Sequence, residues 1–305
     1  MSLWSGRRGP RAVEGVRWRD LDAGHRDAVA VLAGQSATAD GARRTNHLAG
    51  LFLGVRGCLG TGGFVGEQLV AATAVRTGYR PTVEGHVHPA YRGRGLGGAM
   101  LDWALARAGS DVVATTRTLT PQAQRLFESR GLRLAAALER LWLPLDQPVE
   151  TAPPPPGTAL WEWNAGDGFG VYAEAFADLP SNPFADSEEP GRSREDWLEW
   201  TDDMEFVAAC SLLARDADGR PVGFLTCDEG GPLQVGTVPA WRRRGLGRAM
   251  VTAAIARLRA LPERVDVAEV EVSADNVAAV RLFQESGFQP DSRVGYFDVS
   301  RSVHR

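Results

Sequence analysis

Two glycine-rich segments of this 305-residue chain carry the residues best suited to chemistry. Residues 92–97 read Arg-Gly-Arg-Gly-Leu-Gly, and residues 242–247 read Arg-Arg-Arg-Gly-Leu-Gly. Glycine lets the backbone turn tightly and present consecutive N–H groups to one point, while arginine adds positive charge. A helix that begins directly after such a turn adds the positive end of its dipole. Both segments therefore predict a site for a diphosphate group.

The two segments belong to a larger duplication. Each follows a Pro-Ala-aromatic lead-in, at residues 89–91 and 239–241, and each continues into an alanine-rich stretch. A second pair of similar segments, residues 125–131 and 281–287, follows in the same order. Paired motifs that recur in one order predict two domains of similar fold.

A proline-rich segment separates the two copies. Residues 148–157 read Pro-Val-Glu-Thr-Ala-Pro-Pro-Pro-Pro-Gly, which is typical of a stiff, extended spacer. The predicted organisation is a first domain over 1–147, a linker over 148–157 and a second domain over 158–305. Strands, hairpins and helices are expected in both copies, so the predicted fold class is α/β with a mixed sheet.

The spacing of apolar residues predicts the elements that position the two turns. In the first copy we expect strands over 15–20, 84–88 and 112–116, a hairpin over 64–77, helices over 22–34, 96–108 and 121–130, and a last strand over 138–145. In the second copy we expect a helix over 246–258, a strand over 268–272 and a helix over 277–286. The first turn is thus expected to join a strand to a helix, the arrangement that an anion site requires.

Composition excludes several classes of function. The chain is 44% hydrophobic and 24% charged, as soluble globular proteins are, and no apolar run approaches the ~18 residues that span a bilayer. All 34 basic residues are arginine, which excludes a Walker-type phosphate loop and a pyridoxal Schiff base. The dispersed arginines lack aromatic interleaving, so no nucleic-acid partner is expected, and the short apolar runs give no reason to expect a membrane partner.

Cysteine usage indicates the compartment. Cys58, Cys210 and Cys227 are too few and too scattered for a disulfide framework or a zinc site, so no metal is expected. Free thiols are typical of a reducing compartment, and we expect a cytoplasmic protein.

An acidic segment in the second copy bears on the acceptor. Residues 186–205 hold nine acidic side chains, with Trp197 and Trp200 among them. Such a segment would attract a cationic amine, for example an aminoglycoside or a polyamine. The alternative is a solvated amphipathic helix whose tryptophans turn inward.

Residues 87–97 and 238–247 resemble the acetyl-CoA pyrophosphate loop of the GCN5-related N-acetyltransferase (GNAT) family. That family's signature is Gln/Arg-x-x-Gly-x-Gly/Ala, and both copies satisfy it. Residues 273–288, where Asn276 precedes a helix that ends in Gly-Phe, resemble the family's second signature. The tandem layout is similar to that of mycothiol synthase-like two-domain acetyltransferases. The resemblance implies two tandem GNAT-type acyl-CoA N-acyltransferase domains that use acetyl-CoA.

The resemblance also implies a mechanism, in which a primary amine attacks the acetyl thioester directly between two splayed strands. By analogy, the N–H groups of Val87 and Val238 would lie near the thioester carbonyl and stabilise developing oxyanion charge. Asn276 would reach toward the pantetheine arm or the sulfur. The phosphate-facing residues would be Arg92, Gly93, Arg94, Gly95, Leu96 and Gly97 in the first copy and Arg243, Arg244, Gly245, Leu246 and Gly247 in the second.

The general acid departs from the family pattern. The family often places a tyrosine on the second-signature helix, where this chain has Phe127 in the first copy and Phe283 in the second. Neither phenylalanine can protonate a leaving thiolate, which leaves Tyr296 as a spare candidate acid.

A general base is expected on the strand before the loop. The first copy offers Glu84 there, with His86 two residues further on and so on the same face of the strand. The second copy has Gln234 at the equivalent position, and its acids lie elsewhere, Glu271 on the next strand among them.

We therefore expect an acetyl-CoA-dependent N-acetyltransferase that acts on the primary amine of a small molecule, for which the acidic segment leaves a cationic acceptor open. The first copy lacks the asparagine of the second signature and reads Thr-Leu-Thr-Pro-Gln at residues 118–122, so the second copy is favoured as the catalyst. Two alternatives stay open, namely catalysis in the first copy with Glu84 as base, and a non-catalytic acetyl-CoA sensor read by a partner protein. The sequence identifies neither the acceptor nor the oligomeric state.

Overall fold

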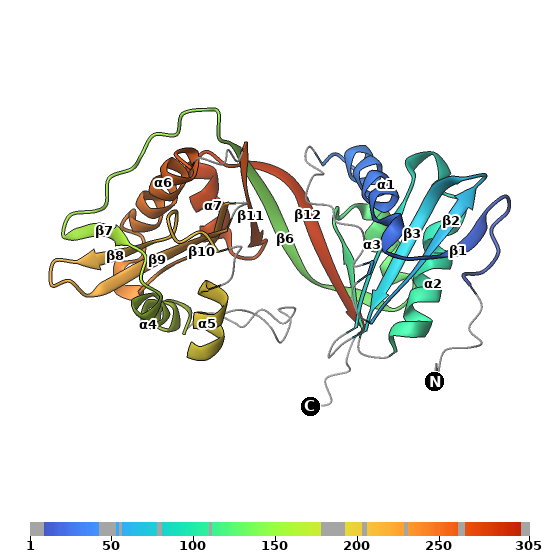
Figure 1. Cartoon of the computed structure of the whole chain (residues 1–305), viewed down its shortest axis with the longest axis horizontal. Coiled ribbons are helices and arrows are strands. Elements are labelled where there is room, and N and C mark those ends of the chain that lie inside the picture. The colour runs from blue at the N-terminus through green and yellow to red at the C-terminus, as the bar shows by residue number, and fades with distance from the viewer. Residues whose placement is uncertain are drawn as a thin grey trace. The chain divides into compact units, whose positions relative to one another are not determined.

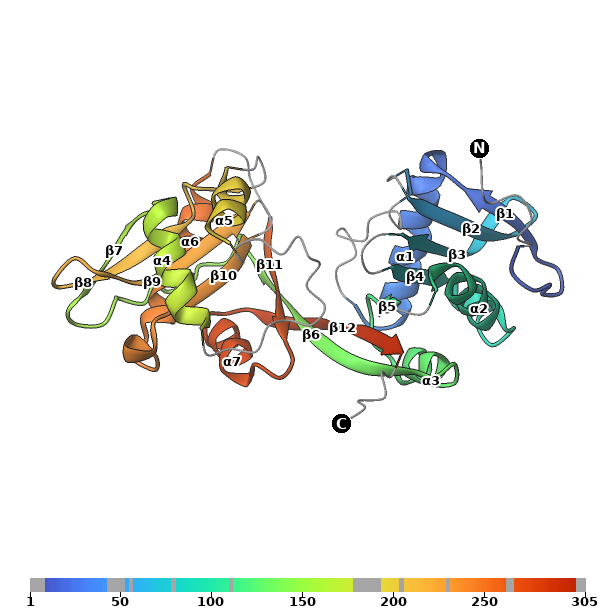
Figure 2. The same cartoon turned by 90° about the horizontal axis from the view of Figure 1, so that it is seen from below.

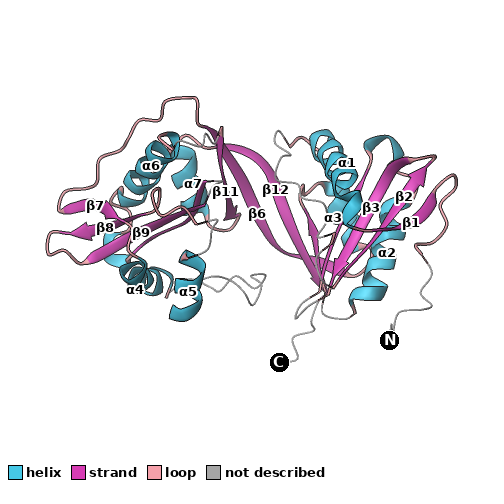
Figure 3. Ribbon diagram, viewed as in Figure 1, coloured by secondary structure: helices cyan, strands magenta, loops and turns pink. Residues whose placement is uncertain are grey.

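The computed structural model describes residues 9–42, 53–54, 57–77, 81–109, 112–177, 193–202, 206–228, 231–261 and 266–299. The chain divides into two compact units, a first unit of residues 1–138 with 291–305 and a second unit of residues 139–290. In each unit helices flank the strands of a sheet (Figure 3). The α/β class expected from the sequence is confirmed.

The first unit contains strands and helices, and three consecutive strands lie between its first two α-helices (Figure 1). In chain order its elements are β1 (Arg17–Leu21), the 3₁₀ turn η1 (Ala23–His25), α1 (Arg26–Ala39), β2 (Cys58–Val65), β3 (Gln68–Arg76), β4 (Thr82–Val87), the 3₁₀ turn η2 (Pro89–Tyr91), α2 (Leu96–Ala108), β5 (Val113–Thr116), α3 (Pro121–Glu128) and the start of β6 (Leu132–Pro144).

The sheet of the first unit runs in the order β1-β2-β3-β4-β5-β12, where β12 is the last strand of the chain (Gln289–Val299). Neighbouring strands from β1 to β4 are antiparallel, and β5 pairs parallel to β4. The tight β2–β3 connection depends on Gly66, whose φ of 60° lies in the left-handed region that glycine adopts freely.

Two apolar layers hold this sheet between its helices. On one face α1 contributes Val29 and Leu32, which pack with Ala72 and Ala74 of β3. On the other face α2 lies against β3 and β4 (Figure 2) and packs with α3 around Phe127. Successive strand residues point to opposite faces, so each strand supplies both layers.

Within the described residues, the second unit repeats this order of strands and α-helices and adds the helix α5. Its elements are the end of β6, β7 (Thr158–Glu162), α4 (Ala165–Phe176), α5 (Arg194–Thr201), β8 (Leu212–Asp216), β9 (Pro221–Asp228), β10 (Gly231–Thr237), the 3₁₀ turn η3 (Pro239–Trp241), α6 (Leu246–Arg259), β11 (Val267–Ser273) and α7 (Val277–Glu285).

Strands β7 to β10 of the second unit form an antiparallel sheet in the order β10-β9-β8-β7, and β11 lies beside β6. One core, which includes Phe224, Met250 and Ile255, joins these strands to α6. The proline-rich segment belongs to this unit, because the Ala152 N–H donates to Thr252 Oγ1 of α6 at 3.0 Å.

The closing strand of the first unit comes from the end of the chain. β12 pairs antiparallel with β5, with Phe297 opposite Ala114, and the Phe297 ring stacks on Phe127 at a centroid distance of 4.4 Å. The domain boundaries predicted at residues 147 and 158 separate the two sequence repeats. The two compact units are divided differently, because the first unit includes residues 291–305 and the second includes residues 139–147.

The start of the first helix differs from the sequence prediction for a local reason. The first helix begins at Arg26 rather than Asp22, because Asp22 caps the short turn η1 by accepting the Gly24 N–H. The helices that follow the glycine turns begin at Leu96 and Leu246, as predicted.

Candidate functional site

The first glycine turn leaves the start of α2 open to an anion. Gly93 and Gly95 have φ values of 77° and 85°, and Gly95 is the N-cap of α2. Glycine has no side chain to cap the helix, and no side chain of the described residues does so in its place. The first N–H groups of a helix have no intrahelical partner, so here they are free to face a phosphate.

The second glycine turn has the same construction. Gly245, with a φ of 89°, is the uncapped N-cap of α6 among the described residues. One position differs, because Arg243 stands where the first copy has Gly93 and takes a φ of 62°. Left-handed backbone is uncommon for a residue with a bulky side chain and carries strain.

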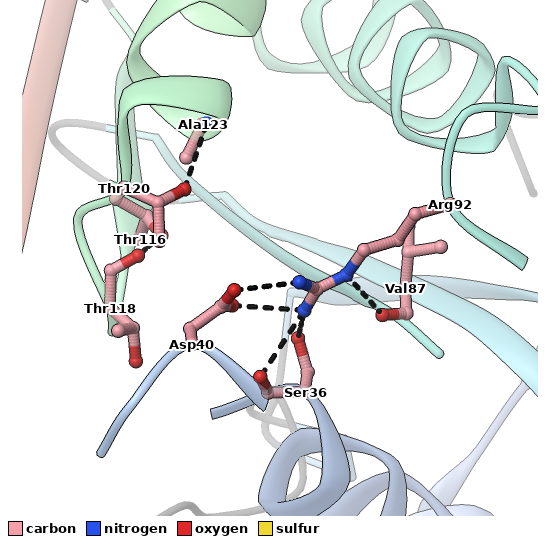
Figure 4. A network of polar contacts seen from close by, with 8 residues as sticks. All are labelled: Ser36, Asp40, Val87, Arg92, Thr116, Thr118, Thr120 and Ala123. Atoms are coloured by element: carbon pink, nitrogen blue, oxygen red, sulfur yellow. Dashed lines mark hydrogen bonds and ion pairs between the residues drawn. The ribbon is translucent and has the colours of Figure 1, made fainter. Parts of the chain in front are cut away.

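The first arginine of each motif holds the loop to the preceding helix. Arg92 binds the Asp40 carboxylate at 2.6 and 2.9 Å, the Ser36 hydroxyl at 2.8 Å and the Val87 carbonyl at 3.4 Å (Figure 4). The sequence predicted that Arg92 faces the phosphate, whereas the structure turns its guanidinium toward α1. There the Asp40 carboxylate already neutralises its charge.

The second unit repeats this clamp with Arg242. Its guanidinium donates to the Thr237 carbonyl five residues upstream and to the Ala175 carbonyl of α4. The equivalent bonds of Arg92 reach Val87, also five residues upstream, and the Ser36 carbonyl of α1. The first arginine of the signature is therefore a structural residue in both units.

The later arginines of the motifs remain at the turn. Arg94 lies over the Tyr91 ring and Arg244 over the Trp241 ring, each at 4.9 Å from the ring centroid. Such cation–π contact holds a guanidinium in place without neutralising its charge. Arg94 and Arg244 are thus the matched cations beside the two open helix ends.

In each unit the strand before the glycine turn separates from the strand that follows the next helix, namely β4 from β5 and β10 from β11. β5 pairs with β4 only at Thr82 and Val83. In the second unit no ladder joins β10 to β11 in the described residues, although Gly231 at the start of β10 lies against the Glu269 backbone. Both pairs of strands therefore meet at one end and open toward the glycine turn.

The register of β4 decides which N–H groups face this opening. The His88 N–H donates to the Val70 carbonyl at 2.8 Å. Hydrogen-bonded and non-hydrogen-bonded pairs alternate along an antiparallel ladder. The preceding residue, Val87, opposite Ala71, therefore directs its N–H away from β3 and toward the opening.

The corresponding prediction for Val238 is wrong by one residue. The Val238 N–H donates to the Val222 carbonyl of β9 at 3.0 Å and is not free for a ligand. Thr237, which is opposite Gly223, is the residue whose N–H faces the opening. Val87 and Thr237 are the equivalent residues of the two units.

A buried charged cluster lies on the opened part of β4. The Glu84 side chain is only 7% exposed, and its Oε1 accepts a hydrogen bond from Arg117 Nε at 3.0 Å. His86, on the same face and 8% exposed, places Nε2 3.8 Å from that oxygen. Ala72 and Ala74, the opposite residues on β3, are small enough to leave room for both side chains.

The second unit has no such charge at these positions. Gln234 corresponds to Glu84, and its buried Oε1 has no hydrogen-bond partner among the described residues. Gly236 corresponds to His86, and a Cβ there would lie 2.5 Å from Phe224 Cε1 and 3.0 Å from Phe176 Cε2. Aromatic rings fill the space that the first unit gives to an imidazole.

Two predicted catalytic residues lie in unexpected surroundings. Glu271 on β11 forms an ion pair with Arg140, whose side chain is only 4% exposed. Tyr296 was expected in the second domain, whereas its strand β12 pairs with β5 and places Tyr296 opposite Thr115 in the first unit.

The predicted pantetheine contact Asn276 is the N-cap of α7, and its Oδ1 accepts the Ala279 N–H at 3.1 Å. Thr120 performs the same task for α3, with its hydroxyl accepting the Ala123 N–H (Figure 4). The two phenylalanines that replace the family tyrosine, Phe127 and Phe283, are buried in the cores.

Part of the acidic segment in the second unit is described. Residues 186–192 and 203–205 lie outside the described residues. In α5 the Trp197 side chain is fully buried against the core, while the acids on that helix are exposed. This arrangement matches the solvated amphipathic helix.

Asp40, Ser36 and Arg117 were not predicted as site residues. A buried acid such as Glu84 in an otherwise apolar strand signals that a cation must lie nearby, but not which one.

Among the described residues there is no cluster of acids, histidines and cysteines suited to a metal. No described helix is long and apolar enough to cross a membrane.

Known proteins resemble both the sequence and the fold. The Acetyltransferase (GNAT) family profile matches residues 45–132 and 171–288. A mycothiol acetyltransferase of Thermobispora bispora is 34% identical over 87% of this chain and 92% of its own length, and one of Nocardia farcinica is 31% identical over 90% and 94%.

Solved structures share the fold. A GCN5-related N-acetyltransferase from Sphaerobacter thermophilus has a TM-score of 0.71 at 23% identity and covers 93% of this chain and 95% of its own. A tandem GNAT protein from the clavulanic acid biosynthesis pathway has a TM-score of 0.57 at 19% identity and covers 94% and 99%.

Proposed function

Since the chain belongs to the GNAT family of acetyltransferases, we propose that it transfers the acetyl group of acetyl-CoA to the primary amine of a small molecule. The family relationship makes it an N-acetyltransferase. The donor, the acceptor class and the unit that carries out the transfer are our proposals.

One observation carries the choice of acetyl-CoA. Both units present an uncapped helix start behind a glycine in left-handed conformation, with an arginine stacked beside it. The diphosphate of coenzyme A fits this combination of N–H groups, dipole and positive charge. The opening between the strands then accepts the pantetheine arm, which brings an activated acetyl thioester to Val87 or Thr237.

The main-chain N–H groups at the opening support direct transfer. When an amine attacks the thioester, negative charge develops on the carbonyl oxygen, and a fixed N–H donor stabilises it. Val87 offers this donor in the first unit and Thr237 in the second. Removing one such donor from an enzyme costs on the order of 100-fold in rate.

We assign the chemistry to the first unit. Its opening holds two ionisable side chains, Glu84 and His86, where the second unit has Gln234 and Gly236. Glu271, the acid predicted for the second unit, is engaged by Arg140. This assignment departs from the preference for the second copy, which depended on the Asn276 signature, because Asn276 serves as a helix cap.

The acceptor is proposed as a small molecule because the curated relatives are named mycothiol acetyltransferases. The exposed acids of α5 give no specific reason to prefer a cationic acceptor. An amine remains the acceptor class, since attack by nitrogen on a thioester needs only a nucleophile and a group that takes its proton.

Calorimetric titration with acetyl-CoA, followed by assay of CoA release, tests the proposal. We expect two molecules bound per chain and CoA release that depends on an added amine. Glucosamine, cysteamine and spermidine represent an amino sugar, an aminothiol and a polyamine. Binding without amine-dependent release would favour the sensor alternative, and no binding would refute the proposed function.

A further inference from the structure

The imidazole of His86 is a buried polar group that folding alone does not explain. Its side chain is 8% exposed, and its Nε2 has no hydrogen-bond partner among the described residues. A buried polar atom without a partner destabilises the folded state, because it loses its hydrogen bonds to water. Such an atom is retained where it has a functional task or where a ligand or water supplies the missing partner.

The charged groups around His86 come from three parts of the first unit. Glu84 lies beside it on β4, Arg117 follows β5, and Asp40 follows α1. Burial lowers the pKa of His86 below its ordinary value, while Glu84 and Asp40 raise it and Arg117 lowers it. Asp40 is itself bound by Arg92. With burial as the largest effect, the imidazole is neutral at pH 7, the form that accepts a proton.

The position of His86 along β4 suits a role in the transfer. The ladder between β4 and β5 ends at Val83, so His86 lies on the opened part of the strand. It directly precedes Val87, whose N–H faces the opening. The imidazole and the N–H group that faces the opening thus belong to consecutive residues of one strand.

Glu84 is less well placed to take the proton. Its Oε1 is already occupied by the Arg117 guanidinium at 3.0 Å, and the same oxygen is the one nearest to His86. His86 Nε2, in contrast, has no partner that must first be displaced. A general base needs an available lone pair within reach of the proton that it abstracts.

We infer that His86 is the proton acceptor for acetyl transfer in the first unit, and that the ion pair of Glu84 and Arg117 sets the charge around its imidazole. This inference rests on the proposed function. The amine nitrogen forms a bond to the thioester carbonyl carbon as the C–S bond breaks. The proton lost by the nitrogen passes to His86 Nε2 and from there to the leaving thiolate, which keeps the electron pair of the broken bond.

The pH profile of kcat separates a proton acceptor from a merely structural residue. With acetyl-CoA and whichever of the three probe amines supports CoA release, activity should fall on the acid side of pH 6.5. His86→Gln should lower kcat by about 100- to 10,000-fold and abolish this acid limb, with acetyl-CoA binding unchanged. His25→Gln, the same exchange at a partly exposed histidine bound to Asp22, should keep the wild-type kcat and the acid limb.

The neighbouring charges give a second test with opposite signs. Glu84→Gln removes the carboxylate that raises the pKa of His86, so the acid limb should move to lower pH. Arg117→Gln removes the cation that lowers this pKa, so the limb should move to higher pH. Shifts in one common direction, or none, would overturn the assignment.

Nuclear magnetic resonance tests His86 without turnover. The His86 imidazole signal, identified by its loss in His86→Gln, should titrate below pH 6.5 and move when acetyl-CoA is added. A signal that titrates at the ordinary value and ignores acetyl-CoA overturns the inference. A His86→Gln protein with wild-type kcat and acid limb does the same while the proposed function stands, whereas failure to bind acetyl-CoA refutes the proposed function itself.

Discussion

The two units have the same construction at the glycine turn, but they differ on the strand that leads into it. Both have an uncapped helix start, a structural arginine that binds the preceding helix and a second arginine stacked on an aromatic ring. On the strand before the turn, the first unit has Glu84 and His86, whereas the second has Gln234 and Gly236. The two copies therefore share the features to which we assign diphosphate binding and differ in those to which we assign proton transfer.

The largest expected effect comes from blocking one turn at a time. Gly95→Glu places a side chain and a negative charge at the start of α2, where a like charge costs several kcal/mol against a phosphate. Because about 1.4 kcal/mol is a factor of ten, turnover should fall by about 100-fold or more. Gly245→Glu is the matched control, with the same strain at a φ of 89°, and should leave turnover within a few-fold.

Calorimetry on the same two variants checks the cause. Each should bind one acetyl-CoA fewer than the wild-type protein, and thermal unfolding should show equal loss of stability for both. If Gly245→Glu abolished turnover and Gly95→Glu did not, the chemistry would belong to the second unit.

A smaller effect tests whether the second unit has room for a side chain where the first has His86. Gly236→Ala should lower the free energy of unfolding by about 1–3 kcal/mol, because the new Cβ would lie 2.5 Å from Phe224 Cε1. Gly170→Ala in α4 is the control, since its Cβ meets nothing within 4 Å and alanine favours helix by up to about 1 kcal/mol. Urea unfolding measures both, and an unchanged midpoint for Gly236→Ala would mean that the rings move aside.

The smallest effect concerns the one position where the two turns differ. Arg243→Gly removes the strain of a φ of 62° and should raise the free energy of unfolding by about 0.5–1 kcal/mol. It also removes a charge from the turn, so the acetyl-CoA affinity of the second unit should weaken a few-fold. Gly93→Arg is the reverse exchange in the first unit and should lower the free energy of unfolding. If Arg243→Gly and Gly93→Arg had the same free energy of unfolding, the strain argument would be contradicted.

Sequence reasoning succeeded where the signals are local. The starts of α2 and α6 were predicted to the residue, because a glycine N-cap and the helical spacing of apolar residues both lie within one short segment. The common face of Glu84 and His86 also followed from the alternation of a strand. These features need no knowledge of distant partners.

The remainder depended on partners far along the chain. Arg117 and Asp40 lie in turns that follow β5 and α1, and the periodic patterns that predict helices and strands do not predict where turn residues lie. Val238 was mistaken for Thr237 because a shift of one residue reverses which N–H groups point toward the neighbouring strand. The pairing of β12 was missed because two similar copies offer similar edges, and only long-range packing, such as Phe297 on Phe127, selects one of them.

The placement of β12 has a consequence for synthesis. Translation delivers residues 1–138 first, yet their sheet lacks its neighbour for β5 until residues 291–299 have been made. Until then the Phe127 face has no Phe297 to cover it, while the second unit already has every residue it needs. The unit that begins first is thus finished last, and a chain terminated early releases no completed copy of the unit to which we assign the chemistry.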